Sequence, residues 1–163
     1  MIVIADASPL NNLVLIEQTN LLPRLFGRIL IPPAVFEELQ DPETPDLVRS
    51  WLASAPSSLQ VQPLQSQADP KLDYLDAGER QAITLAEESK ADQILLDDID
   101  ARQEAARRKL PFIGTLGILR RAAQLDLIDL PSSLARLQQT TFYVDPGLIR
   151  SLLAEEARRR NRS

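Results

Sequence analysis

Short apolar runs alternate with longer amphipathic stretches along this chain. Four of the runs predict strands, at residues 2–5, 28–31, 93–96 and 110–113. Each run is dominated by Ile, Leu or Val and is too short for a helix, which is typical of strands buried on both faces of a parallel sheet.

The stretches between and after these runs predict helices. The first helix opens at Ser8 and Pro9, which suit a cap and a first turn, and Gly27 ends the second. The helices after the first are expected at 21–26, 34–40, about 46–53, 79–88, about 100–109, 116–124, 131–139 and 146–160. The rest of 41–70 is rich in Pro, Ser, Gln and Asp, and is interpreted as loop that serves as an arm or dimer element.

Alternation of strands and helices predicts an α/β fold, with a mostly parallel sheet of four or five strands and helices on both faces. The length of 163 residues fits a single domain covering 1–163. Within it we expect a core at about 1–125 and a C-terminal helical extension at about 126–160.

The composition narrows the chemistry that is open to this chain. It has no Cys and no His, which excludes disulfides, thiol nucleophiles and Cys/His zinc sites. The net charge of −5 argues mildly against a general nucleic-acid binder, although a carboxylate cluster awaiting a metal also adds negative charge. The start MIVIADASPL lacks a basic leader, and no stretch reaches the ~20 apolar residues of a membrane helix, so a soluble cytoplasmic chain is expected.

Acidic residues follow two of the predicted strands. Asp6 comes directly after the first run, and Asp97 and Asp98 come after the third. Ligands of parallel sheets bind at the carboxyl ends of the strands, where these side chains would meet. The alternative for Asp6 is an ordinary turn or helix cap. Asp97 and Asp98 are adjacent, so only one of them is expected to face the site.

Two glutamates occupy the apolar faces of predicted helices. Glu38 shares a face with Val35 and Leu39, although a glutamate there can also extend its carboxylate to solvent. Glu79 begins the stripe Ala82, Ile83 and Ala86. It also occupies the third position of a capping box that starts at Asp76, and the two roles are compatible.

Carboxylates gathered at one sheet edge would repel one another and raise their pKa values. A divalent cation removes that penalty, and a site made only of oxygen ligands favours Mg2+ or Mn2+. The acids therefore predict a metal site.

Five segments together resemble the PIN-domain family, close to its branch of VapC-like toxins. They are IADASPL at 4–10, IPPAVFEEL at 31–39, LDAGERQAITLA at 75–86, ILLDDIDAR at 94–102 and IGTLGIL at 113–119. The resemblance implies a Rossmann-like α/β/α sandwich and a Mg2+- or Mn2+-dependent endoribonuclease, the toxin of a toxin–antitoxin pair. It also implies a cognate antitoxin that covers the site and a homodimer.

The motif positions assign roles to individual residues. The catalytic and metal-binding acids are Asp6, Glu38, Glu79 and Asp98, with Asp97 as a further metal ligand or the alternative to Asp98. Ser8 and Thr115 support the site, and Arg102, followed by Arg107, would bind RNA phosphates. Many relatives carry Thr or Ser two positions before the fourth acid, where this chain has Leu96.

Two rival interpretations remain at the level of sequence. The first is a PIN-like domain of weak or no activity that acts as an RNA- or protein-binding regulatory module, which the acidic charge and Leu96 favour. The second is a phosphotransfer domain with Asp6 as nucleophile. A second Asp two residues after Asp6 would be usual in that class, and Ser8 stands there instead.

Overall fold

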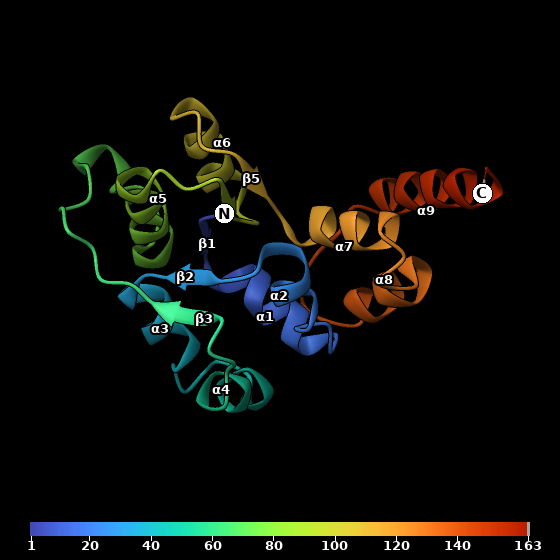
Figure 1. Cartoon of the computed structure of the whole chain (residues 1–163), viewed down its shortest axis with the longest axis horizontal. Coiled ribbons are helices and arrows are strands. Elements are labelled where there is room, and N and C mark those ends of the chain that lie inside the picture. The colour runs from blue at the N-terminus through green and yellow to red at the C-terminus, as the bar shows by residue number, and fades with distance from the viewer. Residues whose placement is uncertain (163) are drawn as a thin grey trace.

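A parallel sheet of five strands forms the centre of the computed structural model, which describes residues 1–162 (Figure 1). The strands are β1 (Val3–Ala5), β2 (Ile29–Ile31), β3 (Leu59–Val61), β4 (Gln93–Leu95) and β5 (Phe112–Ile113). They lie in the order β3-β2-β1-β4-β5, and every neighbouring pair is parallel. The expected α/β fold is confirmed, and the sheet is parallel throughout.

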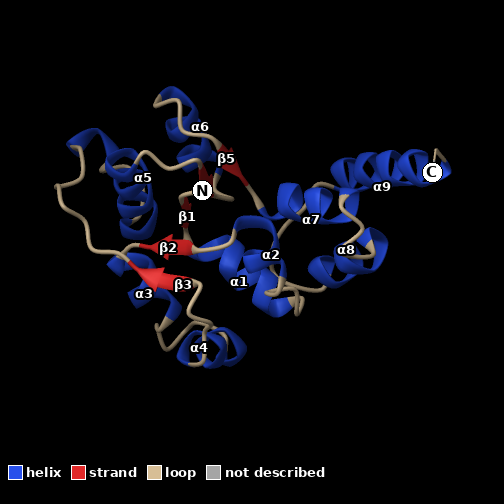
Figure 2. Cartoon of the chain, in the orientation of Figure 1, coloured by secondary structure: helices blue, strands red, loops and turns tan. Residues whose placement is uncertain are grey.

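Helices surround this sheet and make up most of the chain (Figure 2). They are α1 (Ala7–Leu15), α2 (Leu21–Phe26), α3 (Pro33–Leu39), α4 (Asp46–Ala53), α5 (Ala77–Ser89), α6 (Ile99–Arg107), α7 (Thr115–Gln124), α8 (Leu130–Gln138) and α9 (Pro146–Asn161). A short 3-10 helix at Pro70–Leu72 precedes α5.

The side chains of β1, β2, β4 and β5 alternate between two apolar clusters. Ile4, Leu30 and Ile94 pack in the smaller cluster, with residues of α5 and α6. Val3 and Leu95 face the other way, into a larger cluster that α1 to α4 and α7 to α9 complete. This period of two is what a sheet buried on both faces requires.

Strand β3 lies within the segment that the sequence predicted as loop. The interpretation of 41–70 as an arm with one helix was therefore wrong at residues 59–61. β3 is an edge strand that pairs only with β2. Gln60 and Val61 are exposed, so the run lacks the buried apolar pattern by which the other strands were recognised.

The register of the two central strands aligns their carboxyl ends. Ala5 of β1 lies opposite Leu95 of β4, and the Asp6 amide donates a hydrogen bond to the Leu95 carbonyl at 3.0 Å. The residues that follow both strands therefore leave the sheet at the same edge, next to the start of α1.

The C-terminal helices pack beside α7 at one end of the molecule, and α9 projects from it (Figure 1). Leu134, Leu137 and Leu152 from α8 and α9 belong to the larger apolar cluster. Within residues 1–162, no helix has both the length and the apolar character that crossing a membrane requires.

Candidate functional site: an acidic pocket

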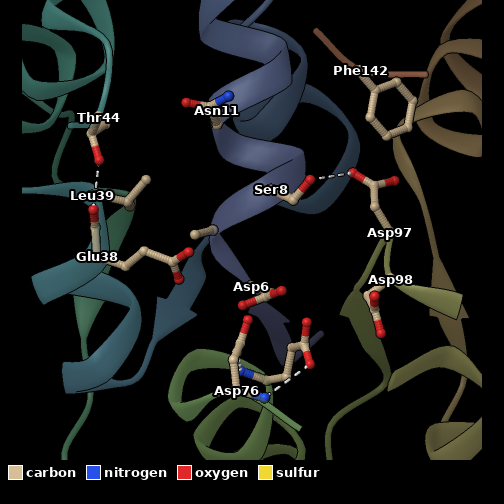
Figure 3. A pocket seen from close by; sticks show the side chains of 12 residues that line it. Asp6, Ser8, Asn11, Glu38, Leu39, Thr44, Asp76, Asp97, Asp98 and Phe142 are labelled. Carbon is tan, nitrogen blue, oxygen red and sulfur yellow. Dashed lines mark hydrogen bonds between the residues drawn. The ribbon is translucent and has the colours of Figure 1, made fainter. Parts of the chain in front are cut away.

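A pocket of about 490 Å³ opens at the carboxyl edge of the sheet (Figure 3). The residues that line it are Asp6, Ala7, Ser8, Asn11, Glu38, Leu39, Thr44, Asp76, Glu79, Asp97, Asp98 and Phe142. All the acids predicted for the site line this one pocket, although they come from β1, α3, α5 and the end of β4. In Figure 3, Asp6 lies between Glu38 on one side and the two adjacent aspartates on the other.

Asp6 differs from the other aspartates that begin helices. It occupies the cap position of α1, yet its side chain makes no capping hydrogen bond. The side chains of Asp69, Asp76, Asp98, Asp129 and Asp145 all accept such a bond at their helices. Asp6 is 5% exposed, and its Oδ1 atom has no hydrogen-bond partner within the described residues. Asp6 therefore occupies a cap position without using its side chain as a cap.

Burial raises the pKa of Asp6 well above its usual value, and the charges of Asp76, Glu38 and Glu79 raise it further. The amide of Ala7 offsets only part of this effect. A buried carboxylate with negative neighbours favours its protonated form unless a positive charge arrives. The environment of Asp6 therefore favours a cation.

Glu38 reaches the pocket from α3 with an exposed side chain, so its head contacts solvent as the simpler interpretation expected. Partial desolvation, together with the charges of Asp76 and Asp41, raises its pKa. A Cβ atom built on Gly78 would lie 3.0 Å from Glu38 Oε2 and 3.1 Å from Asp6 Oδ1. The two carboxylates thus converge on a space that stays open because α5 has a glycine there.

Glu79 is the third residue of the capping box that starts α5, as predicted. Its amide donates to Asp76 Oδ1 at 2.8 Å, and its Oε2 accepts from the Asp76 amide at 3.3 Å. Glu79 also lines the pocket, so one side chain takes part in the capping box and borders the pocket. Burial, then the charges of Asp76 and Asp98, raise the pKa of Glu79 to about 7.

Asp97 is held by a network of hydrogen bonds. The Thr115 amide and hydroxyl donate to its two oxygens, each at 2.7 Å. Ser8 Oγ and Asn12 Nδ2 donate to Asp97 Oδ2 at 3.2 Å. Asn12 also donates to Thr115 Oγ1, and both residues are buried. Ser8 and Thr115 therefore contact the acids through Asp97, whose carboxylate they fix.

Asp98 is more exposed than Asp97 and begins α6. Its Oδ2 accepts the amide of Ala101 at 3.0 Å. The expectation that only one of the two aspartates faces the site was wrong, because both line the pocket. They differ in that Asp97 is saturated by four donors, whereas Asp98 accepts one helix-capping bond.

The two predicted phosphate-binding arginines lie in different surroundings. Arg102 stacks over the Phe112 ring at 5.1 Å and forms no ion pair within the described residues. A Cβ on Gly114 would lie 2.8 Å from Asp97 Oδ1 and 3.6 Å from Arg102 Nη1, so the guanidinium lies beside the pocket. Arg107 instead pairs with Glu104 and Tyr74 and is not among the lining residues.

The side chains of this pocket fit a hard divalent cation. Asp6 Oδ1, which has no partner within residues 1–162, and Glu38 Oε2 border the gap beside Gly78. Both are carboxylate oxygens, which are the ligands that Mg2+ prefers. Within residues 1–162, no three acids are close enough to form a finished cage. The donor set is that of an open site, in which Mg2+ characteristically retains water ligands.

Other residues of the pocket escaped the sequence analysis as site residues. Asp76 was recognised only as a helix cap, while Asn11, Thr44 and Phe142 carried no signal. Phe142 is 23 residues beyond the last family-like motif, which ends at Leu119, and nothing local indicates that its segment returns to the sheet edge.

A parallel sheet with helices on both faces and an acidic pocket at the carboxyl edge of its strands defines a class of α/β domains with a candidate site for a cation. The sequence assigns the chain within that class, because a PIN-domain family model matches residues 2–157. The chain belongs to the PIN-domain family, whose members are typically nucleases.

The chain resembles a PilT N-terminus domain protein from the hyperthermophilic archaeon Sulfolobus solfataricus P2, with 13% sequence identity and a TM-score of 0.49. The similarity covers 89% of this chain and 100% of that one, and at this level it carries no functional argument. No curated protein matches the sequence at a significant level.

Proposed function

We propose that this chain is a Mg2+- or Mn2+-dependent endoribonuclease of the VapC-like kind. The observation that carries the proposal is the Asp6 carboxylate, which is buried, has no partner at Oδ1 and opens into a pocket shared with four other predicted acids. Burying an unpaired carboxylate is costly, and its persistence next to like charges is explained when a cation binds there.

The acids would have different roles at this site. Asp6, Glu38, Glu79 and Asp98 would hold the cation, with Asp97 as the alternative to Asp98. A bound divalent cation supplies the charge that polarises a phosphodiester and lowers the pKa of water. Glu38, exposed at the pocket, is suited to orient or deprotonate the attacking water.

Proton release and phosphate binding complete the picture. Without a cation Glu79, with a pKa of about 7, is partly protonated at neutral pH, and it would release that proton on binding the cation. The unpaired guanidinium of Arg102 would bind an RNA phosphate first. Arg107 would follow only by leaving Glu104.

The test is cleavage of single-stranded RNA by the purified protein. Cleavage is expected with Mg2+ or Mn2+ and none with a chelator, and Asp6→Asn should lower the rate by at least about 100-fold. The substitution removes a buried charge, so without cation it should raise the midpoint of thermal unfolding by about 2–4 °C. A folded Asp6→Asn protein with full cation-dependent activity would remove Asp6 from the site.

Glu38 has a matched control next to it. Glu37 is also exposed on α3 and does not line the acidic pocket. Glu38→Gln and Glu37→Gln remove the same charge from adjacent positions. Only Glu38→Gln is expected to weaken Mn2+ binding in calorimetry and to slow cleavage, and equal effects would point to net charge alone.

The resemblance to VapC toxins leads to further proposals about partners. An antitoxin protein would cover the pocket with a basic side chain, since desolvated charges of opposite sign attract. Two copies of the chain would form a homodimer, and the chain would act in the cytoplasm. Growth arrest on expression of the wild-type chain but not of Asp6→Asn tests the toxin role, and light scattering tests the dimer.

One specific observation favours the rival function of a regulatory binding module. Within residues 1–162 the acids do not form a finished metal cage, and Leu96 replaces the hydroxyl residue of many relatives. Calorimetry of RNA binding beside a cleavage assay separates the two functions, because a module without catalysis would bind RNA and show no cation-dependent cleavage. Tight Mn2+ binding that is lost in Asp6→Asn contradicts the rival.

A further inference from the structure

An aromatic side chain, Phe142, lines the acidic pocket. In Figure 3 its ring lies at the rim, on the side of Asp97 and away from Glu38. The ring is only partly buried and packs against the larger apolar cluster. It therefore has both a fixed position and a surface that faces the pocket.

The segment between α8 and α9 fixes this position. The Phe142 amide donates to Thr140 Oγ1 at 3.2 Å, and the same hydroxyl donates to the Leu137 carbonyl at 2.6 Å. Phe142 and Val144 both contact the apolar cluster, whereas Tyr143 between them is 81% exposed. This alternation of an extended segment directs Phe142 inward and Tyr143 outward.

Asn11 is a second unused group of the pocket. It lies between Thr44 and Phe142 in Figure 3. Its side-chain amide makes no hydrogen bond within residues 1–162, whereas the amide of Asn12 is engaged with Thr115 and Asp97. An amide offers one acceptor and two donor hydrogens, which is the pattern that the edge of a nucleobase complements.

The negative charge of the protein favours a contribution to RNA binding that does not depend on charge. The net charge is −5, and Arg102 is the one arginine that the geometry places beside the pocket without an ion pair among the described residues. Phosphate contacts alone would bind RNA weakly. Stacking of a base on an aromatic ring adds about 1–3 kcal/mol and does not depend on charge.

We infer that Phe142 and Asn11 form a nucleobase subsite, in which one unpaired base of single-stranded RNA stacks on the ring while the amide contacts its edge. This inference rests on RNA being the substrate, as proposed above. The pocket, at about 490 Å³, is within the range that holds one small ligand. It admits one nucleotide that has left its stack and excludes a base-paired helix.

The experiment uses the full chain and a single-stranded RNA that carries 2-aminopurine, whose fluorescence falls on stacking. Binding is measured with Ca2+ and cleavage with Mn2+. Phe142→Leu keeps the apolar packing but removes the aromatic face. It is expected to abolish most of the quenching and to raise KM about tenfold, with kcat within about twofold.

Three further variants show whether the effect belongs to this subsite. Phe142→Tyr should restore both readouts, because it keeps the ring. Tyr143→Leu removes the neighbouring aromatic ring, which does not line the pocket, and should change neither. Asn11→Ala should leave stacking intact and weaken the preference for one base beside the cleaved bond.

The outcomes separate this inference from the proposed function. Cleavage by Phe142→Leu with the KM and quenching of the wild-type chain overturns the subsite and leaves the ribonuclease standing. Quenching by the wild-type chain that Phe142→Leu loses, without any cleavage, supports the subsite and overturns the ribonuclease. Absence of both quenching and cleavage overturns both.

Discussion

At the scale of one residue, Asp6 differs from the other aspartates that precede helices, although the residue type and the local position are the same. Most aspartates that precede helices in this chain cap the helix with their side chain, whereas Asp6 makes no capping bond and its Oδ1 has no partner within residues 1–162. Local sequence places an acid directly before a helix in both cases. The difference arises from burial, because only at Asp6 does the fold withdraw the carboxylate from water and surround it with other acids.

Glu79 predicts a measurable pH dependence of the stability of the fold. Its pKa of about 7 in the fold exceeds that of an unfolded glutamate, so between about pH 4.5 and 7 the folded state holds a proton that the unfolded state has released. Without cation, stability should therefore fall as the pH rises through this window, by on the order of 3 kcal/mol. Thermal unfolding from pH 4.5 to 8 measures it.

Two controls isolate Glu79. Glu79→Gln keeps the capping box, because glutamine also suits the third position, and should remove the share of the slope that belongs to Glu79. The slope that remains belongs to Asp6 and Glu38, whose pKa values are also raised. Saturating Mn2+ should flatten the slope as well, since it stabilises the ionised form. Glu104, whose partner Tyr74 and two neighbouring arginines lower its pKa to about 2, has its full effect above pH 4.5 and does not mask the window. An unchanged slope in Glu79→Gln would contradict the assignment.

At the scale of elements, the start of α5 does two things at once. Its capping box starts the helix, and Gly78, the second residue of the helix, leaves room for the carboxylates of Asp6 and Glu38. A helix gains about 1 kcal/mol from alanine in place of glycine. The glycine is therefore suboptimal for the helix but keeps open the space between the two carboxylates.

Gly78→Ala is expected to preserve or slightly raise stability while weakening Mn2+ binding by about tenfold or more, because the methyl group would occupy the space between the two acids. Gly147→Ala is the matched control. Gly147 is the second residue of α9, and its Cβ would meet Asp145 Oδ2 at 3.3 Å, outside the acidic pocket. Calorimetry and thermal unfolding of both variants test this, and equal Mn2+ affinities would show that the gap beside Gly78 is not used.

At the scale of the whole molecule, the C-terminal helices contribute to the same apolar cluster as the central strands. They also bring Phe142 to the pocket. We propose that residues 1–163 form one cooperative domain, in which the helical extension is part of the core rather than an appendage.

Leu152 and Leu148 of α9 test this proposal as a pair, since they are 8% and 45% exposed. Leu152→Ala should cost about 2–4 kcal/mol and lower the midpoint of a single transition by roughly 5–10 °C. Leu148→Ala should stay within about 0.5 kcal/mol of the wild-type chain. Calorimetry of unfolding decides it. A separate transition for the C-terminal helices, alone sensitive to Leu152→Ala, would show two units.

The sequence by itself determined the α/β class, four of the five strands and the helices, because burial on both faces of a sheet and on one face of a helix leaves periodic apolar patterns. It also identified five of the six acids that line the pocket, all but Asp76, since strand ends and apolar helix faces are local features. Edge strand β3 was missed because half-exposed residues carry no such pattern.

Only the tertiary structure decided that the acids share one pocket, that Asp97 is saturated while Asp6 is not, and that Phe142 returns to its rim. Those properties depend on contacts between residues far apart in the chain. They are set by how the helices pack across the sheet, and no local preference encodes them.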